Sequence, residues 1–206
     1  ETRIVTPPRK TIYYFFPEGG NLVAGFSNNV AFKAVFENGF PAPVNAVIRN
    51  SKGESVATLS DYHDGMGMFE LNPQPGEKYY AAAGDEKYYL PDPVEKGVTV
   101  NMIQHEKGFF YELQQPPNDL VYNVAYLVGQ MQHRVVFSQE LKPGSSSLQG
   151  IVNTKQLRSG IIQVTFFNKN GIPLAERLWF NNNHEYIQQA DILTDTVNLK
   201  ARGRNR

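Results

Sequence analysis

The chain has 206 residues with 20 basic and 20 acidic side chains, so its formal net charge at pH 7 is zero. This balance excludes a typical nucleic-acid-binding protein, whose affinity depends on clustered Lys and Arg side chains that face phosphates. The absence of cysteine excludes a disulfide framework, a thiol nucleophile and a thiolate metal site. Apolar residues make up 41% of the chain, enough for a packed core. No apolar run approaches the roughly 20 residues that a membrane-spanning helix needs.

Alternation of apolar and polar residues predicts β-strands along most of the chain. The clearest alternating stretches are 30–36, 44–48, 98–102, 120–128 and 162–166. In each of them every second side chain is apolar, as expected where one face of a strand is buried. No stretch of ten or more residues has apolar positions at helical spacing, so we expect helix to be a minor component.

Turn residues separate these stretches at short intervals. Asn38-Gly39, Asp64-Gly65 and Asn170-Gly171 are of the kind that hairpin turns require, because glycine adopts positive φ without a steric penalty. Short strands between such turns predict an all-β sandwich or barrel. The stretches 34–48 and 164–180 both contain a strand, Asn-Gly, one apolar residue, Pro and a second strand, which indicates a shared hairpin type.

The length of the chain predicts two domains, because one sandwich of this kind needs roughly 100 residues. The proline-rich stretch 90–97 lacks alternation and is the natural boundary. We therefore expect one β-sandwich at 11–96 and a second at 97–182. The residues 183–206 contain a strand-like piece at 196–201, and a strand without partners is not stable alone. We expect this segment to be a tail or the start of a further domain in a longer protein.

Three blocks of the sequence resemble a known family. FFPEGGNLVAGFSNNVAFKAVFENGFP (15–41) and DYHDGMGMFELNPQPGEKYYA (61–81) resemble the first of the paired macroglobulin-like (MG2-type) domains in large envelope proteins of Bacteroides-type bacteria. SGIIQVTFFNKNGIPLAERLWFNN (159–182) resembles the end of the second domain of such a pair. The resemblance covers about residues 12–182. It implies tandem immunoglobulin- or fibronectin-III-like sandwiches, related to the domains of alpha-2-macroglobulin, in a periplasmic, outer-membrane or cell-surface chain.

The resemblance also limits the activity that we expect. Macroglobulins with a thioester trap proteases through a Cys–Gln bond, and this chain has no cysteine. The chain can therefore serve only as scaffold for such a reaction. As partners, the resemblance implies other domains of the same chain and other envelope proteins, and some relatives occur beside carboxypeptidase-regulatory-like and TonB-dependent receptor plug segments.

One short segment is a weak candidate for a metal site. Asp61, His63 and Asp64 fall within four residues, and oxygen-rich loops attract Ca²⁺. The segment lacks the alternating Asp/Asn residues and the distal Glu of a calcium loop, which favours a solvated turn with a capping Asp. The histidines show no pair at the spacing of zinc ligands. We therefore expect neither a metal nor a cofactor.

No motif in the sequence indicates catalysis. There is no G-x-S-x-G sequence, and Ser145-Ser146-Ser147 is typical of a loop. Gly65-x-Gly67 lacks the Lys-Ser/Thr of a phosphate-binding loop. The cationic C-terminal residues are interpreted as the solvated continuation of a strand and not as a phosphate site; they are Lys200, Arg202, Arg204 and Arg206. We therefore expect no catalytic residues and no enzymatic activity.

Consecutive aromatic residues are the most distinctive pattern for binding. The pairs Tyr13-Tyr14, Tyr79-Tyr80 and Tyr88-Tyr89 lie in predicted strands, where neighbouring side chains point to opposite faces. One ring of each pair is therefore expected to face outward. The candidate binding residues are Tyr14, Tyr80, Tyr89 and Trp179. Packing between domains is the favoured interpretation, and a platform on which sugar rings stack is the alternative.

These observations predict a non-catalytic structural and interaction segment of a larger cell-envelope protein, which presents β-sandwich modules to partners. The alternative is a carbohydrate-binding module that uses the outward-facing tyrosines. The periplasmic or outer-membrane location is implied by the resemblance alone. The sequence predicts no nucleic-acid partner and no transmembrane segment.

Overall fold

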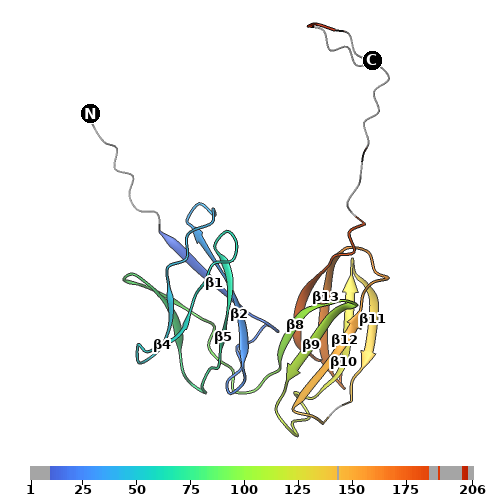
Figure 1. Ribbon diagram of the computed structural model, residues 1–206. Helices are drawn as coiled ribbons and strands as arrows, with labels where there is room; N and C mark the ends of the chain where they lie inside the picture. Colours follow the sequence, from blue (N-terminus) through green and yellow to red (C-terminus); the bar gives the residue numbers. More distant parts are fainter. Residues whose placement is uncertain (1–9, 143, 186–189, 191–200, 204–206) are drawn as a thin grey trace, which may run out of the picture.

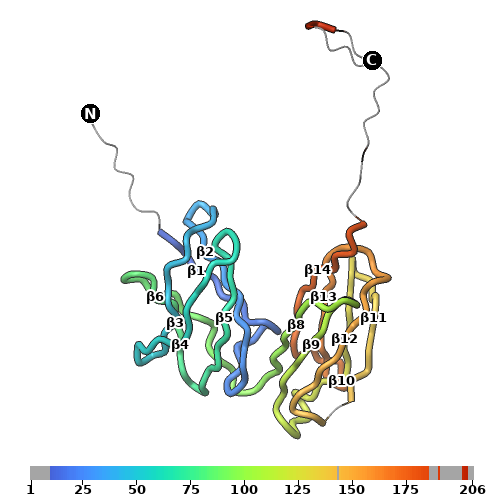
Figure 2. The backbone as a smooth tube through the Cα atoms, in the orientation of Figure 1, coloured from blue at the N-terminus to red at the C-terminus, as the bar shows by residue number. Residues whose placement is uncertain are grey.

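The computed structural model describes residues 10–142, 144–185, 190 and 201–203 (Figure 1). In this part of the chain, fourteen strands are joined by turns and irregular segments, and no residue is helical. The described residues thus include no helix that is long and apolar enough to cross a membrane. The strands form four antiparallel sheets, and their path is traced in Figure 2. The predicted all-β sandwich fold is confirmed.

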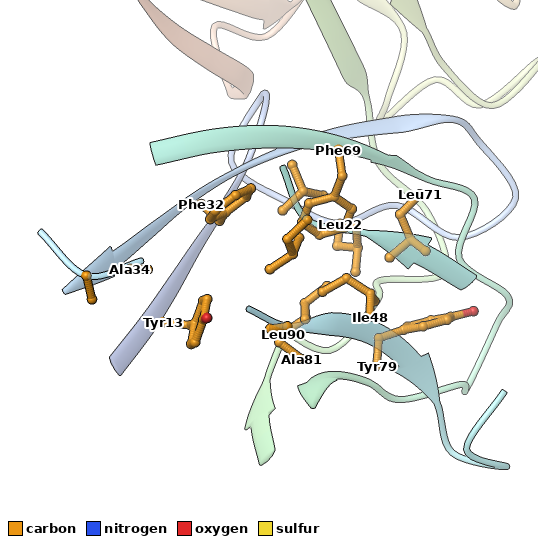
Figure 3. Close-up of a cluster of buried hydrophobic side chains, with 14 residues drawn as sticks. Tyr13, Leu22, Phe32, Ala34, Ile48, Phe69, Leu71, Tyr79, Ala81 and Leu90 are labelled. Atoms are coloured by element: carbon orange, nitrogen blue, oxygen red, sulfur yellow. The ribbon is translucent and has the colours of Figure 1, made fainter. Parts of the chain in front are cut away.

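The first sandwich consists of two sheets with the strand orders β1-β2-β5 and β4-β3-β6-β7. Its strands are β1 (Thr11–Pro17), β2 (Asn28–Phe36), β3 (Val47–Asn50), β4 (Ser55–Thr58), β5 (Met66–Leu71), β6 (Tyr79–Ala83) and β7 (Glu86–Tyr89). Phe32 from the first sheet and Ile48 from the second are both fully buried in the core between the sheets (Figure 3). Burial of such side chains contributes about 1.5–3 kcal/mol each, so the alternating pattern selects which face of each sheet turns inward.

The second sandwich consists of sheets with the strand orders β12-β9-β8 and β11-β10-β13-β14. Its strands are β8 (Thr99–His105), β9 (Gly108–Gln114), β10 (Val124–Met131), β11 (Arg134–Glu140), β12 (Ser147–Asn153), β13 (Gly160–Asn168) and β14 (Pro173–Asn181). Tyr111 from β9 and Phe166 from β13 pack across the core with their ring centroids 5.6 Å apart. The second core shares no residue with the first among the described residues.

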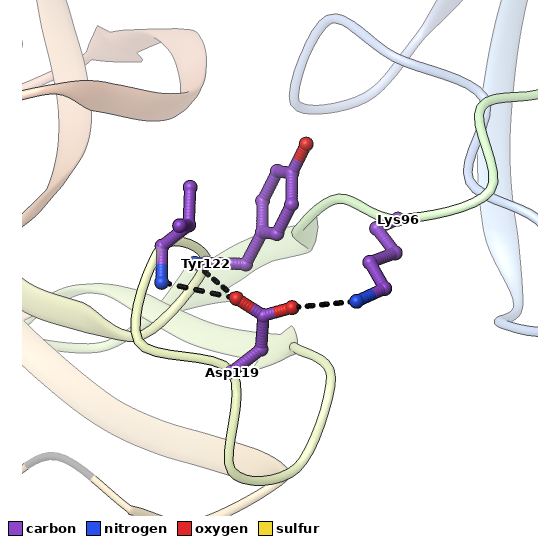
Figure 4. Close-up of polar contacts among 4 residues, drawn as sticks. Lys96, Asp119 and Tyr122 are labelled. Atoms are coloured by element: carbon purple, nitrogen blue, oxygen red, sulfur yellow. Dashed lines mark hydrogen bonds and ion pairs between the residues drawn. The ribbon is translucent and has the colours of Figure 1, made fainter.

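Two of the predicted strands begin later than expected. The stretch 120–128 enters the sheet only at Val124, because the Asp119 carboxylate accepts hydrogen bonds from the backbone N–H groups of Val121 (3.0 Å) and Tyr122 (3.3 Å) (Figure 4). This turn holds the preceding residues out of the ladder. The stretch 44–48 likewise forms a strand only from Val47 onward. Its first residues cross from one sheet to the other, so their alternation reflects burial and not strand pairing.

The two stretches share the same turn, although only the second turn joins two paired strands, because β2 and β3 lie in different sheets. The backbone N–H of Gly39 donates to the carbonyl oxygen of Phe36 at 2.8 Å, and that of Gly171 donates to the carbonyl oxygen of Asn168 at 3.0 Å. Both glycines have positive φ, 82° and 76°. The same spacing of Asn, Gly and Pro therefore builds the same turn in both sandwiches.

The predicted boundary at 90–97 lies between β7 and β8 and forms no strand. Apart from Ala201, the strand-like piece predicted at 196–201 lies outside the described residues. Of the cationic C-terminal residues, only Arg202 is described.

Candidate functional site

The three candidate tyrosines do not form one platform. Tyr14 and Tyr89 are exposed, as expected for outward positions of β1 and β7, but these strands belong to different sheets. Tyr80 differs from the expectation, because only 8% of its surface is exposed. The centroids of the Tyr80 and Tyr89 rings are 5.8 Å apart, and the Lys87 ammonium lies 4.6 Å from the centroid of the Tyr80 ring. Tyr80 points away from the core but is covered by its own neighbours.

The fourth candidate, Trp179, faces the second core. Its ring packs on Phe109 with the centroids 5.3 Å apart, and Phe109 is fully buried. Asn181, two residues further along β14, is buried as well, and its amide donates to the carbonyl oxygen of Arg158 at 3.0 Å. Both residues therefore take part in the interior of the second sandwich.

We expect Tyr89→Ala to lower the free energy of unfolding by less than about 1 kcal/mol, because a cross-strand aromatic pair on an exposed face contributes only about 0.2–1 kcal/mol. Tyr13→Ala, in the first core, is expected to cost about 3 kcal/mol or more, since Tyr13 is buried and its hydroxyl accepts a hydrogen bond from the Asn45 N–H at 3.1 Å. Urea denaturation of both variants measures the difference. A loss of unfolding free energy for Tyr89→Ala as large as that for Tyr13→Ala would contradict the placement of Tyr89 on an exposed face.

The weak metal candidates lie in an exposed turn before β5. His63 Nε2 is 3.3 Å from Asp64 Oδ2, and both side chains are largely open to solvent. No hydrogen bond or ion pair joins Asp61 to either residue in the described structure. Across the residues that the structure describes, no three His, Asp or Glu side chains are arranged to hold a metal ion.

The contact between the two sandwiches contains the most buried ion pair of the described structure. A guanidinium nitrogen of Arg177 (Nη2), on β14, lies 2.6 Å from a carboxylate oxygen of Glu18 (Oε1), just after β1. The two side chains are 26% and 7% exposed. Arg177 Nη1 also donates to the carbonyl oxygen of Met102 on β8 at 2.6 Å, and the second oxygen of Glu18 accepts from the Asn29 amide at 3.3 Å. Three strands, β2, β8 and β14, and the segment just after β1 thus meet at this pair.

Burial raises the pKa of Glu18 above its ordinary value, although the positive charge of Arg177 and the hydrogen bond from Asn29 both lower it. Desolvation therefore outweighs the favourable charge. The carboxylate depends on Arg177 for its compensation, because a buried charge without a partner costs several kcal/mol.

The backbone beside Glu18 joins the second sandwich directly. The carbonyl oxygen of Gly19 accepts a hydrogen bond from the N–H of Glu176 at 3.3 Å. Gly19 has a φ of 90°, and a Cβ at this position would lie 3.2 Å from Val100 Cγ1 and 3.5 Å from Ala175 Cβ. The positive φ favours glycine at this position, and the added Cβ would also press against Val100 of the second sandwich.

The boundary segment 90–97 is tied to both sandwiches. The N–H of Val94 donates to the carbonyl oxygen of Leu22 at 2.8 Å, and the N–H of Ala24 donates to that of Val94 at 2.9 Å. Lys96 Nζ is 3.0 Å from Asp119 Oδ2, which belongs to the second sandwich (Figure 4). The hydrogen bond from Lys96, together with the backbone donors, lowers the pKa of Asp119. The segment is therefore a bonded connection and not a free linker.

A polar cavity of about 180 Å³ lies between the two sandwiches, and we call it the junction cleft. Ser27, Asn29 and Glu70 line it from the first sandwich, and Thr99, Asn101 and Glu112 line it from the second. Ser27 Oγ donates to Glu70 Oε1 at 2.5 Å. The cleft brings two carboxylates and several hydroxyl and amide groups together from both halves of the chain.

Sequence analysis identified neither the ion pair nor the cleft. One signal was present at Arg177, which occupies an inward position of a strand between Ala175 and Trp179. A charged residue in an apolar row indicates a buried partner.

Comparisons with known proteins show no family for this chain, since no protein-family model matches it and no curated protein matches it in sequence.

Proposed function

We propose that the chain is a non-catalytic structural and interaction segment of a larger, macroglobulin-like cell-envelope protein, located in the periplasm or at the outer-membrane surface. In this proposal, residues 11–96 and 97–182 are two domains that are held in a defined arrangement and present their surfaces to partners. The family and the location are supported by the resemblance of residues 15–41, 61–81 and 159–182. The rigid arrangement is supported by the Glu18–Arg177 pair.

The junction supports a spacer function because its contacts come from several segments at once. Domains in one chain move relative to each other unless their interface is well packed. Here the end of β1 bonds to β14, and the boundary segment bonds to both sandwiches. Separation would break the Glu18–Arg177 pair and the backbone hydrogen bond from Glu176 to Gly19 at the same time.

A distance measurement between the two sandwiches tests this proposal. The chain has no native cysteine, so Lys52→Cys and Lys155→Cys introduce spin labels at one exposed position on each sandwich. We expect double electron–electron resonance to give one narrow distance distribution. A control with a short Gly-Ser insertion after Lys96 is expected to give a broad distribution. An equally broad distribution in the uninterrupted chain would remove the spacer function.

The proposed location is tested separately by fractionation of the source cells. An antibody raised against the 206-residue chain is expected to detect the full-length protein in the envelope fraction. Recovery in the cytosolic fraction would contradict the location without affecting the rigid arrangement.

A further inference from the structure

The junction cleft lies between the outward faces of two three-stranded sheets. Asn29 on β2 and Glu70 on β5 are paired neighbours in sheet β1-β2-β5. Asn101 on β8 and Glu112 on β9 are paired neighbours in sheet β12-β9-β8. All four side chains line the cleft. The two sandwiches diverge upward from the junction in Figure 1, so the same two sheet faces continue outward from this polar floor.

Beyond this floor, the next rows of side chains on the two sheet faces are mainly apolar. On the first sheet the register places Phe16, Ala31 and Met68 in one row, followed by Tyr14, Lys33 and Met66. On the second sheet it places Ile103, Phe110 and Ile151 in one row. Phe16, Met68, Ile103 and Ile151 are exposed large apolar side chains. Aligned apolar rows beside a polar cavity are typical of an interaction surface.

The floor of the cleft is complementary to a cation that carries hydrogen-bond donors. Glu70 and Glu112 approach from opposite sides, and neither forms an ion pair with a residue that the structure describes. Thr99 lines the same cavity, and its hydroxyl forms no hydrogen bond within the described part of the chain and is not sealed from the cavity. A guanidinium group fits these acceptors well because it offers several donors in fixed directions.

We propose that the junction cleft binds a loop of a partner protein that carries Arg or Lys at its tip and apolar side chains on both sides of it. This inference rests on the proposed function, because the cleft exists only while the two sandwiches are docked. The basic tip contacts Glu70, Glu112 and Thr99. The flanking apolar side chains contact the rows of Phe16 and Ile103. A loop suits this site because its tip can contact the polar floor while its two arms lie along the strands that lead away from it (Figure 1).

Selection from a phage-displayed library of disulfide-closed loops tests the proposal with the full chain as bait. We expect enrichment of loops with Arg or Lys at the tip between apolar residues. The Glu70→Gln,Glu112→Gln variant is expected to bind a synthetic enriched loop at least about tenfold more weakly, the loss of one charge-assisted hydrogen bond. The control Glu37→Gln, at an exposed turn of the first sandwich, leaves binding unchanged.

Ile103→Ser tests the apolar wall in the same assay. Ile161→Ser is its matched control, because both isoleucines are 53% exposed and lie on different sheets of the second sandwich. We expect only Ile103→Ser to weaken binding. Urea denaturation of each variant confirms that its fold is intact.

Several outcomes would overturn the proposal. They are the absence of enriched loops, enriched loops without a basic residue, and binding that Glu70→Gln,Glu112→Gln leaves intact. Sedimentation velocity that shows a dimer, which Ile103→Ser dissociates, would assign the cleft to a second copy of the chain and also overturn it. A narrow spin-label distribution together with no bound loop would remove only this inference. A broad distribution would remove the proposed spacer function.

Discussion

Arg177→Met is expected to release the two sandwiches from their fixed arrangement. The substitution keeps much of the side-chain volume but leaves the Glu18 carboxylate buried without its cation. Removal of one partner of a buried ion pair costs about 3–5 kcal/mol, and we expect the lower end of this range for docking of the sandwiches. The spin-label distance distribution measures the effect and should become broad. Arg134→Met, an exposed arginine on β11 of the same sheet, is the control and should leave the distribution narrow.

The defect of Arg177→Met is expected to depend on pH. Burial already raises the pKa of Glu18 in the docked state, and the substitution removes the charge that lowers it. A carboxyl group with a raised pKa in the docked state binds a proton more readily there, so its protonation favours docking. The defect should therefore be large at about pH 8 and should shrink toward about pH 5.

The double variant Glu18→Gln,Arg177→Met separates charge from packing. Glutamine is neutral, so the double variant is expected to dock better than Arg177→Met alone at about pH 8. Equal broadening of the distance distribution in both variants would show that the lost charge is not the cause.

Gly65→Ala is expected to lower the free energy of unfolding by more than about 3 kcal/mol, the combined cost of positive φ and of overpacking. Gly65 has a φ of 75°, and a Cβ there would lie 2.4 Å from the carbonyl oxygen of Ala34 and 2.9 Å from that of Ala42. Both contacts are with backbone atoms, which cannot move aside as a flexible side chain can. The carbonyl oxygen of Gly65 also accepts a hydrogen bond from the Ala34 N–H at 2.7 Å, so any shift of the turn disturbs β2.

Gly76→Ala is the matched control for this prediction. Gly76 has a nearly equal φ of 72°, but no atom lies within 4 Å of the position that its Cβ would occupy. Its substitution is expected to cost only the backbone strain, about 1–2 kcal/mol. Urea denaturation compares the unfolding free energies of the two variants. Equal losses would show that the backbone atoms close to Gly65 add nothing to the cost of the Ala substitution. The comparison also tests the interpretation that the Asp64-Gly65-Met66-Gly67 turn is structural.

Local features of the fold could be predicted because they depend on neighbouring residues. The alternation in 30–36 and 162–166 corresponds to β2 and β13, since side chains on a strand point to opposite faces with a period of two. The turns at Gly39 and Gly171 followed from the tolerance of glycine for positive φ. These properties belong to the backbone and need no distant contact.

The same local reasoning was wrong where a distant residue competes with strand pairing. The stretch 44–48 is apolar at alternate positions, but its first part crosses between the sheets and the Asn45 N–H bonds to the hydroxyl of Tyr13. Tyr80 points away from the core, as a strand doublet requires, but Tyr89 and Lys87 cover it. The exposure of an outward side chain depends on which neighbouring side chains cover it. The alternation along a strand predicts only the face on which the side chain lies.

The amino-acid sequence determined that this protein is a series of strands with buried faces and glycine turns. Tertiary structure alone decided that Glu18 meets Arg177 and that Glu70 and Glu112 line one cleft. Strand formation and turn type depend on steric limits within a few residues. The meeting of charges from opposite ends of the chain depends on how two finished surfaces dock, and no local pattern encodes that arrangement.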